Sequence, residues 1–192
     1  MLYRAVFFDR DDTLNIDPGY LNDPSEVKLF PGVPEGIANL KAVCDFKIVV
    51  VSNQSGITRG LVSNNTVDLI HNRINEILSE FNTSIDAFYY CPYHPDYDPP
   101  EKTICRKPSP YMIVQAAEEL KLDLKKSYLV GDKYSDIECA INAGVKPILI
   151  NYNQDKDLIN LLKKDGKTPN FVASNFNAVV NFIISDSLGD SN

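Results

Sequence analysis

Two carboxylates spaced by one residue, Asp9 and Asp11, directly follow the apolar run 5–8. Carboxylates this close repel each other unless a proton or a cation intervenes, and a hard cation such as Mg²⁺ prefers oxygen ligands. Asp9 is nearest the apolar run and best fixed, so we expect it to act as a nucleophile. Asp11 is expected to protonate a leaving oxygen and later to deprotonate water. The alternative for this segment alone is an acidic turn that caps a helix.

Hydroxyl and amide side chains follow the second apolar run. The stretch Ser52, Asn53, Gln54 and Ser55 comes directly after residues 48–51. Such donors, together with backbone N–H groups, can hold phosphate oxygens, and Ser52 is expected to contribute to catalysis. A polar turn that caps the next helix is the simpler alternative for this stretch when it is considered alone.

Two further charged segments complete the candidate chemistry. Lys107 could neutralise charge on a transferred phosphoryl group, and Arg106 offers a planar fork for a second anion. Asp132 and Asp136 follow the run 127–130. Asp132 would add a carboxylate to the metal, and Asp136 could orient Lys107 or water on the metal. Taken singly, these segments could be a surface basic pair and a helix N-terminal Asp.

The order of apolar and amphipathic segments predicts the elements that must position these groups. Strands are expected at 5–8, 48–51, 87–90, 127–130, 147–150 and, more weakly, 171–173, and helices at 33–43, 64–81, 111–120, 135–143, 156–164 and 176–184. Val67, Ile70, Ile74, Ile77, Leu78 and Phe81 form a helical stripe. Alternating strands and helices predict an α/β protein with a doubly wound, mainly parallel sheet, whose ligands bind outside the carboxyl ends of the strands.

Length and composition restrict the class of protein. The 192 residues suit one domain, expected over 1–186 and followed by a flexible polar tail at 187–192. The net charge of −7 argues against a general nucleic-acid binder. No apolar run approaches the roughly 20 residues of a membrane span, and no leader pattern is present, so a cytoplasmic protein without a membrane partner is expected.

The 4 cysteines are too few and too scattered for a disulfide scaffold, and Cys44 and Cys139 are expected to be buried thiols.

These residues together resemble the haloacid dehalogenase (HAD) superfamily of phosphohydrolases, over most of the chain. The matching positions are Asp9, Asp11 and Thr13; Ser52; Lys107; and Asp132 with Asp136. The resemblance implies a phosphoric monoester hydrolase with one Mg²⁺, bound by Asp9, the carbonyl of Asp11, and Asp132. Thr13 and Asp136 would orient the residues that contact the metal and the substrate. The reaction would pass through an aspartyl-phosphate on Asp9.

Within the superfamily the chain is most similar to D-glycero-D-manno-heptose 1,7-bisphosphate 7-phosphatases. The similarity lies in 9–15, 17–20, 30–33, 52–57, 59–60, 91–92, 105–108 and 130–133. It implies a small phosphorylated sugar as substrate, a cap reduced to loops, and a monomer. The implied substrate contacts are Asp17, Gly19, Tyr20, Ser52, Asn53, Gln54, Ser55, Arg106, Lys107 and Lys133.

The exact substrate and the biological role stay open. Histidinol-phosphate phosphatase is the alternative within the class, and a non-catalytic protein that binds a phosphometabolite is the alternative outside it. Heptose phosphates serve lipopolysaccharide, capsule and other glycans, and the sequence does not choose between them.

Two departures from the family pattern are visible. Asp12 stands where the usual loop has glycine, and we expect a similar loop with added negative charge. Many relatives carry structural zinc on four Cys and His ligands, two of which are replaced here by Tyr93 and Thr103. Zinc is therefore not expected. The only rescue would be a weak site at Cys91, His94 and Cys105.

Overall fold

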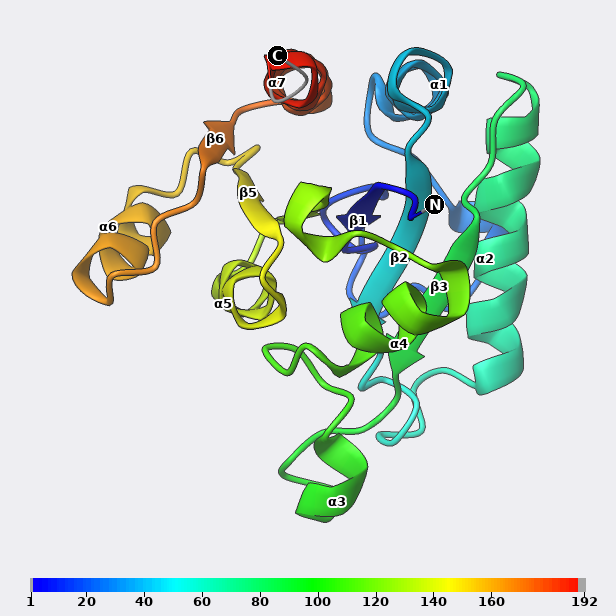
Figure 1. Cartoon of the computed structure of the whole chain (residues 1–192). Coiled ribbons are helices and arrows are strands. Elements are labelled where there is room, and N and C mark those ends of the chain that lie inside the picture. Colours follow the sequence, from blue (N-terminus) through cyan, green and yellow to red (C-terminus); the bar gives the residue numbers. More distant parts are fainter. Residues whose placement is uncertain (1, 190–192) are drawn as a thin grey trace.

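The computed structural model describes residues 2–189, in which six parallel strands form one sheet in the order β3-β2-β1-β4-β5-β6 (Figure 1). The strands are β1 (Ala5–Phe8), β2 (Lys47–Asn53), β3 (Ala87–Cys91), β4 (Tyr128–Gly131), β5 (Lys146–Ile150) and β6 (Phe171–Ala173). The order runs outward from β1 in both directions, as in a doubly wound sheet. The predicted fold class is confirmed.

Helices cover both faces of the sheet. They are α1 (Val33–Cys44), α2 (Asn64–Ser79), α3 (Pro100–Thr103), α4 (Tyr111–Leu120), α5 (Tyr134–Ala143), α6 (Lys156–Lys164) and α7 (Phe176–Gly189), with 3-10 turns η1 (Pro24–Glu26) and η2 (Leu124–Lys126). The core on one face joins the sheet to α1, α2 and α7, and the core on the other joins it to α4 and α5. A smaller cluster packs α6 against β5 and α5.

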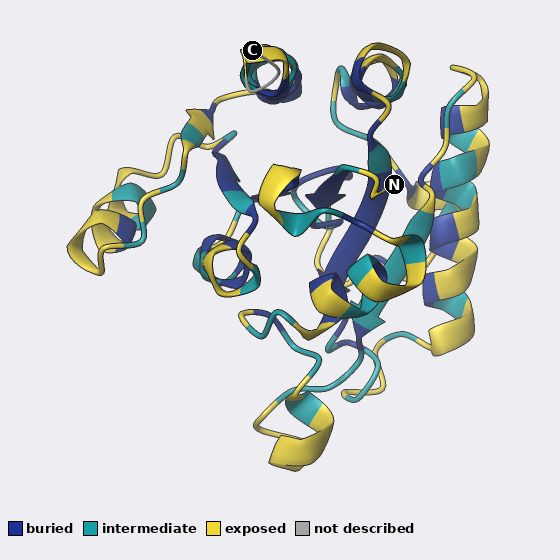
Figure 2. Ribbon diagram, viewed as in Figure 1, coloured by how far each residue is buried: buried dark blue, intermediate teal, exposed yellow. Residues whose placement is uncertain are grey.

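The central strand β1 is apolar along its whole length because both of its faces are covered. In β1, Val6 and Phe8 enter one core, while Ala5 and Phe7 enter the other, and all four are fully buried. Figure 2 shows this buried centre, in contrast to the exposed α3 segment beyond it. In the parallel register, Phe8 of β1 lies opposite Val50 of β2 and Val130 of β4. This register aligns the carboxyl ends of the three central strands.

The observed elements agree with the expected ones to within a few residues, with three differences. The segment 91–110, in which no strand or helix is expected from the sequence, contains α3. Phe81, placed on the stripe of α2, lies beyond the end of that helix and is partly exposed. Residues 187–189, expected in a flexible tail, continue α7, with Ser187 buried; 190–192 lie outside the described residues.

The direction in which successive strands are added to the sheet reverses between β1 and β4, the point at which doubly wound sheets form a ligand crevice. The loops that follow β1, β2 and β3 all lie at this end of the sheet, and Figure 1 shows the segment with α3 projecting beyond it. No helix within 2–189 combines the length and apolar character needed to cross a membrane.

Candidate active site

A buried lysine joins two carboxylates at the carboxyl end of β1. Nζ of Lys107 lies 2.8 Å from Oδ1 of Asp9 and 2.6 Å from Oδ1 of Asp136, and all three side chains are almost fully buried. Burial alone would lower the pKa of Lys107, but Asp136 and Asp9 outweigh burial and raise it, so the lysine stays charged. The backbone N–H of Lys133 donates to Oδ2 of Asp136 at 3.0 Å. Asp136 thus holds Lys107 beside Asp9.

Gly131, the last residue of β4, allows this close packing. A Cβ atom at this position would lie 2.4 Å from Cβ and Cγ of Asp136, a distance at which the two residues would collide. The glycine before Asp132 is therefore required by packing, since its backbone has no unusual φ.

Three carboxylates converge beside the lysine. Asp9, Asp132 and Asp136 each offer an oxygen within 4.8 Å of the others. Burial, and then the charge of Asp9, raise the pKa of Asp132 to about 7. A bound cation would relieve this repulsion, and hard oxygen donors suit Mg²⁺. Nζ of Lys107 and the backbone N–H of Lys133 occupy both oxygens of Asp136, whereas Lys107 pairs with Oδ1 of Asp9, so Asp9 and Asp132 are the better placed ligands. Oγ1 of Thr13 donates to Oδ1 of Asp132 at 3.3 Å and so orients it.

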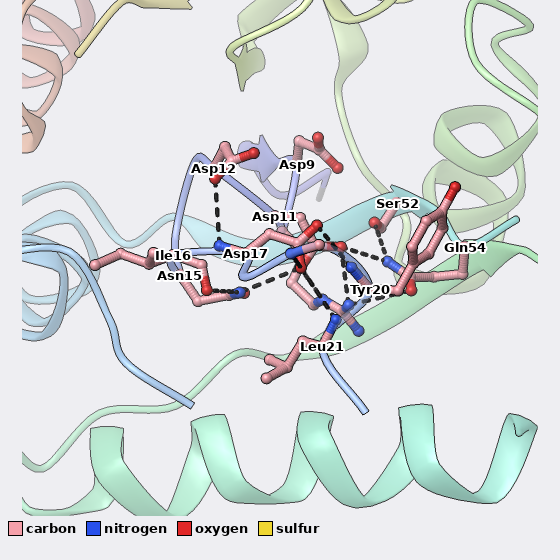
Figure 3. Close-up of polar contacts among 12 residues, drawn as sticks. Asp9, Asp11, Asp12, Asn15, Ile16, Asp17, Tyr20, Leu21, Ser52 and Gln54 are labelled. Atoms are coloured by element: carbon pink, nitrogen blue, oxygen red, sulfur yellow. Dashed lines mark hydrogen bonds and ion pairs between the residues drawn. The ribbon is translucent and has the colours of Figure 1, made fainter. Parts of the chain in front are cut away.

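The carboxylate of Asp11 lies in a cradle of N–H donors (Figure 3). Nε and Nη2 of Arg10 donate to its two oxygens at 2.9 and 2.8 Å, Asn15 Nδ2 donates at 3.1 Å, and Gln54 Nε2 donates at 2.8 Å. Burial alone would raise the pKa of Asp11, but Arg10, then Gln54 and Asn15, outweigh it and hold that pKa below its usual range. Asp11 is therefore ionised in this arrangement.

The polar residues at the end of β2 and directly after it make two kinds of contact. Ser52 is buried at the strand end, and its Oγ accepts a hydrogen bond from Nε2 of Gln54 at 2.9 Å. Both ends of the Asn53 amide instead bind the backbone of Lys107, at 2.9 and 3.1 Å. Asn53 thus fixes the segment that carries Lys107, and it lines the cleft together with Ser52, Gln54 and Ser55.

The loop after β1 is shaped by its own acidic side chains. The carboxylate of Asp17 accepts the backbone N–H groups of Gly19, Tyr20 and Leu21 at 3.1, 3.4 and 3.0 Å. Asp12 accepts the backbone N–H of Asp17 at 3.2 Å (Figure 3) and has a φ of 60°, which its short polar side chain tolerates. Asp12 thus occupies a backbone conformation that glycine adopts readily, and Asp17 orders the turn that presents Gly19 and Tyr20.

These groups line a cleft of about 430 Å³ that also includes Arg106 and Lys133. Arg106 is half-buried, and its Nη1 donates to the carbonyl of Tyr93 at 3.3 Å. The guanidinium of Arg59 covers the ring of Tyr20 and donates to its hydroxyl. A second hollow of about 460 Å³ adjoins the cleft beside β5. It lacks the buried lysine and the nucleophile candidate, so we place the chemistry in the cleft.

The residues 104–179 match the family model described as HAD-hydrolase-like. The D-glycero-D-manno-heptose-1,7-bisphosphate 7-phosphatase of Chlorobaculum tepidum is 37% identical over 191 residues, which cover 94% of each chain. The chain belongs to the HAD-like phosphatases. The D-glycero-beta-D-manno-heptose-1,7-bisphosphate 7-phosphatase of Escherichia coli K12 is 37% identical over 73% of this chain and 75% of its own.

A solved HAD-like phosphatase has the same architecture. It is the D,D-heptose 1,7-bisphosphate phosphatase of B. bronchiseptica, complexed with magnesium and phosphate, with a TM-score of 0.80 and 30% identity. The match covers 95% of this chain and 99% of that one. The superfamily expected from the sequence is therefore confirmed, and a phosphoric monoester hydrolase follows from it.

In this HAD-like phosphatase a disulfide closes the loop before Arg106. Cys91 and Cys105 are bonded with their Cα atoms 5.4 Å apart, a pairing that the sequence analysis did not anticipate. In this oxidised form neither sulfur is a thiolate, so the two cannot bind zinc together with His94, whose Nδ1 accepts the N–H of Asp96 at 3.2 Å. Zinc binding by the reduced chain stays a question for metal analysis. Cys44 and Cys139 are buried free thiols, as expected.

We expect reduction of the disulfide to destabilise the protein and to loosen the Arg106 segment. The bond joins residues 14 positions apart, and closure of a loop of this length contributes about 3 kcal/mol to the free energy of unfolding. Urea unfolding with and without dithiothreitol, in the presence of a zinc chelator, measures this loss. A Cys91→Ala, Cys105→Ala variant is the control and should not respond to dithiothreitol. An equal response of wild type and control would contradict the prediction.

Proposed function

We propose that this chain is a magnesium-dependent phosphatase that forms an aspartyl-phosphate on Asp9. The observation that carries the proposal is the buried row of Asp9, Lys107 and Asp136 beside Asp132 at the carboxyl end of β1. Nζ of Lys107 lies 2.8 Å from Oδ1 of Asp9 and fixes the position of this side chain, whose carboxylate is the group proposed to attack phosphorus. The same lysine can then stabilise charge on the transferred oxygens.

The proposed reaction has two balanced steps. In the first, a carboxylate oxygen of Asp9 forms a bond to phosphorus as the ester P–O bond breaks, and a proton passes from the Asp11 carboxyl group to the leaving alcohol oxygen. In the second, water attacks the same phosphorus and gives a proton to Asp11. The bond from Asp9 to phosphorus then breaks, and inorganic phosphate leaves.

Asp9, the carbonyl of Asp11, and Asp132 would hold the magnesium ion, which supplies positive charge to the phosphoryl oxygens when bound. Ser52 and Lys107, at the ends of neighbouring segments, bind these oxygens from the protein side. Asp11 is ionised in the free enzyme, so it must acquire its proton before or during substrate binding.

For the substrate we propose the 7-phosphate of D-glycero-D-manno-heptose 1,7-bisphosphate. The names of the relatives in Chlorobaculum tepidum and Escherichia coli support this choice, as does a cleft that offers Arg106 and Lys133 in addition to the reacting centre. We further propose a single-domain cytoplasmic enzyme that acts as a monomer in the synthesis of a heptose-containing glycan such as lipopolysaccharide.

The test is release of phosphate from the heptose bisphosphate, with and without magnesium. ³¹P NMR of the product identifies which phosphate is lost. Histidinol phosphate is assayed in parallel, and a higher kcat/KM for it would favour the alternative substrate. Failure to release phosphate from either compound or from p-nitrophenyl phosphate, with magnesium present, would leave only a non-catalytic binding protein.

We expect Arg106→Ala to impair the bisphosphate much more than p-nitrophenyl phosphate. Arg106 can bind the phosphate that does not react, and a hydrogen bond to a charged group contributes about 1.5–3 kcal/mol, or about 10- to 150-fold in kcat/KM. Steady-state kinetics on the two substrates give the ratio. Arg73→Ala is the matched control, because Arg73 lies exposed on α2 with Glu76 as its partner. Equal losses on both substrates would exclude this function of Arg106.

A further inference from the structure

Arg10 is an arginine without access to solvent in the loop that carries the nucleophile. It lies between Asp9 and Asp11 in the sequence, and only 1% of its surface is exposed. A guanidinium ion buried to this extent is costly unless its N–H groups find charged or polar acceptors. Its Nε and Nη2 atoms bind both oxygens of Asp11, and Nη2 also donates to Oε1 of Gln54 at 3.1 Å.

These contacts fix the Asp11 carboxyl group in one orientation. Its two oxygens offer about four lone-pair positions. They are met by the two Arg10 donors, by Asn15 Nδ2 on Oδ1, and by Gln54 Nε2 on Oδ2. A bidentate guanidinium defines the plane of the carboxylate as well as its position. Any rotation of the Asp11 side chain would therefore break both Arg10 hydrogen bonds together.

The fork approaches Asp11 from the protein interior and leaves the cleft side open. Both residues line the cleft, but the Asp11 side chain keeps 15% exposure and that of Arg10 only 1%. The amide of Gln54 also donates to Oγ of Ser52 at 2.9 Å, so Gln54 has a second acceptor next to the proposed phosphate position. The Gln54 hydrogen bond can thus be exchanged when a phosphate binds, while the Arg10 fork stays in place.

We propose that Arg10 is a positioning residue that aims the Asp11 carboxyl group at the leaving oxygen of the substrate. The inference rests on the proposed function, because it assigns Arg10 a part in the proton transfer by Asp11. Arg10 touches neither substrate nor metal and acts through Asp11 alone. The contribution of Arg10 to kcat should therefore be larger for a leaving group that must be protonated. A purely structural role of Arg10 would affect all substrates equally.

Phenyl phosphate and p-nitrophenyl phosphate provide the test, because they differ only in the basicity of the leaving group. General acid catalysis contributes about 10²- to 10⁴-fold when a basic leaving group must be protonated. Arg10→Lys retains the positive charge but loses the planar fork. We expect its loss in kcat to be at least about tenfold larger on phenyl phosphate than on p-nitrophenyl phosphate, with little change in KM. Equal losses in kcat on the two substrates would overturn the proposal.

A double-mutant cycle with Asp11→Asn separates positioning from general damage. If Arg10 acts through Asp11, Arg10→Lys should cause no further substrate-selective loss when Asp11 is already replaced. An undiminished selective loss in that background would overturn the proposal. Thermal unfolding monitors the fold, and Arg10→Gln, which keeps a planar donor without the charge, replaces Arg10→Lys if the latter does not fold. A wild-type protein inactive on the two aryl phosphates and on the heptose bisphosphate would instead overturn the proposed function itself, and this inference with it.

Discussion

Asp9→Asn is expected to lower kcat by at least about 1000-fold on every substrate, because the amide cannot attack phosphorus as a carboxylate does. The substitution keeps the shape of the side chain and still offers an oxygen to Nζ of Lys107, which lies 2.8 Å from Oδ1 in the wild type. The fold should therefore persist. Steady-state kinetics on the heptose bisphosphate and on p-nitrophenyl phosphate measure the loss.

The loss must be shown to come from the chemistry. Asp45→Asn is the matched control: Asp45 is exposed after α1 with a φ of 52°, a conformation that asparagine tolerates well. It should retain wild-type kcat and stability. Beryllofluoride with magnesium, which imitates a phosphoryl group on a carboxylate, should bind to wild type and not to Asp9→Asn. An Asp9→Asn protein that keeps a tenth of wild-type turnover would exclude Asp9 as the nucleophile.

The architecture could be predicted because burial on both faces leaves a strong trace in the sequence. Strands such as β1 and β5 are short apolar runs, and the carboxyl ends of neighbouring parallel strands meet at one edge. These two rules are enough to place Asp9, Ser52 and Asp132 together. The segment with α3 was missed because its prolines suggested irregular chain. Pro100, however, stands at the start of α3, where the missing N–H costs nothing.

The contacts of individual side chains within the site are harder to predict from the sequence than the fold. Asn53 and Asp17 line the cleft, and their contacts with substrate stay predictions, but their side chains also bind backbone atoms of Lys107 and of residues 19–21. Sequence alone does not show which partner such a group takes. Arg10 was overlooked because arginine is rarely buried without a charged partner, and that partner proved to be the adjacent Asp11. A disulfide between Cys91 and Cys105 requires their Cα atoms to lie within a few ångströms of each other, and their separation of 14 residues in the sequence does not determine that distance.

Lys107→Met is expected to abolish activity and also to lower the free energy of unfolding by about 3–5 kcal/mol near neutral pH, because a buried ion pair loses one partner. In the wild type the lysine lies 2.8 Å from Asp9 and 2.6 Å from Asp136. Methionine fills a similar volume without charge, so two buried carboxylates would face each other uncompensated. Urea unfolding and released phosphate measure the two effects.

The pH dependence identifies the cause of this destabilisation. Burial already raises the pKa of Asp136 in the wild type although Lys107 opposes it, so without the lysine this pKa should rise further above its value in the unfolded chain. The folded variant then binds protons more readily than the unfolded one, so its stability increases as pH falls, and the deficit relative to wild type should shrink between pH 8 and pH 5. Adding Asp136→Asn to Lys107→Met should recover stability but not activity, while Lys126→Met, an exposed control, should change neither. A deficit that is independent of pH and unaffected by Asp136→Asn would show that lost packing, rather than unpaired charge, destabilises the variant.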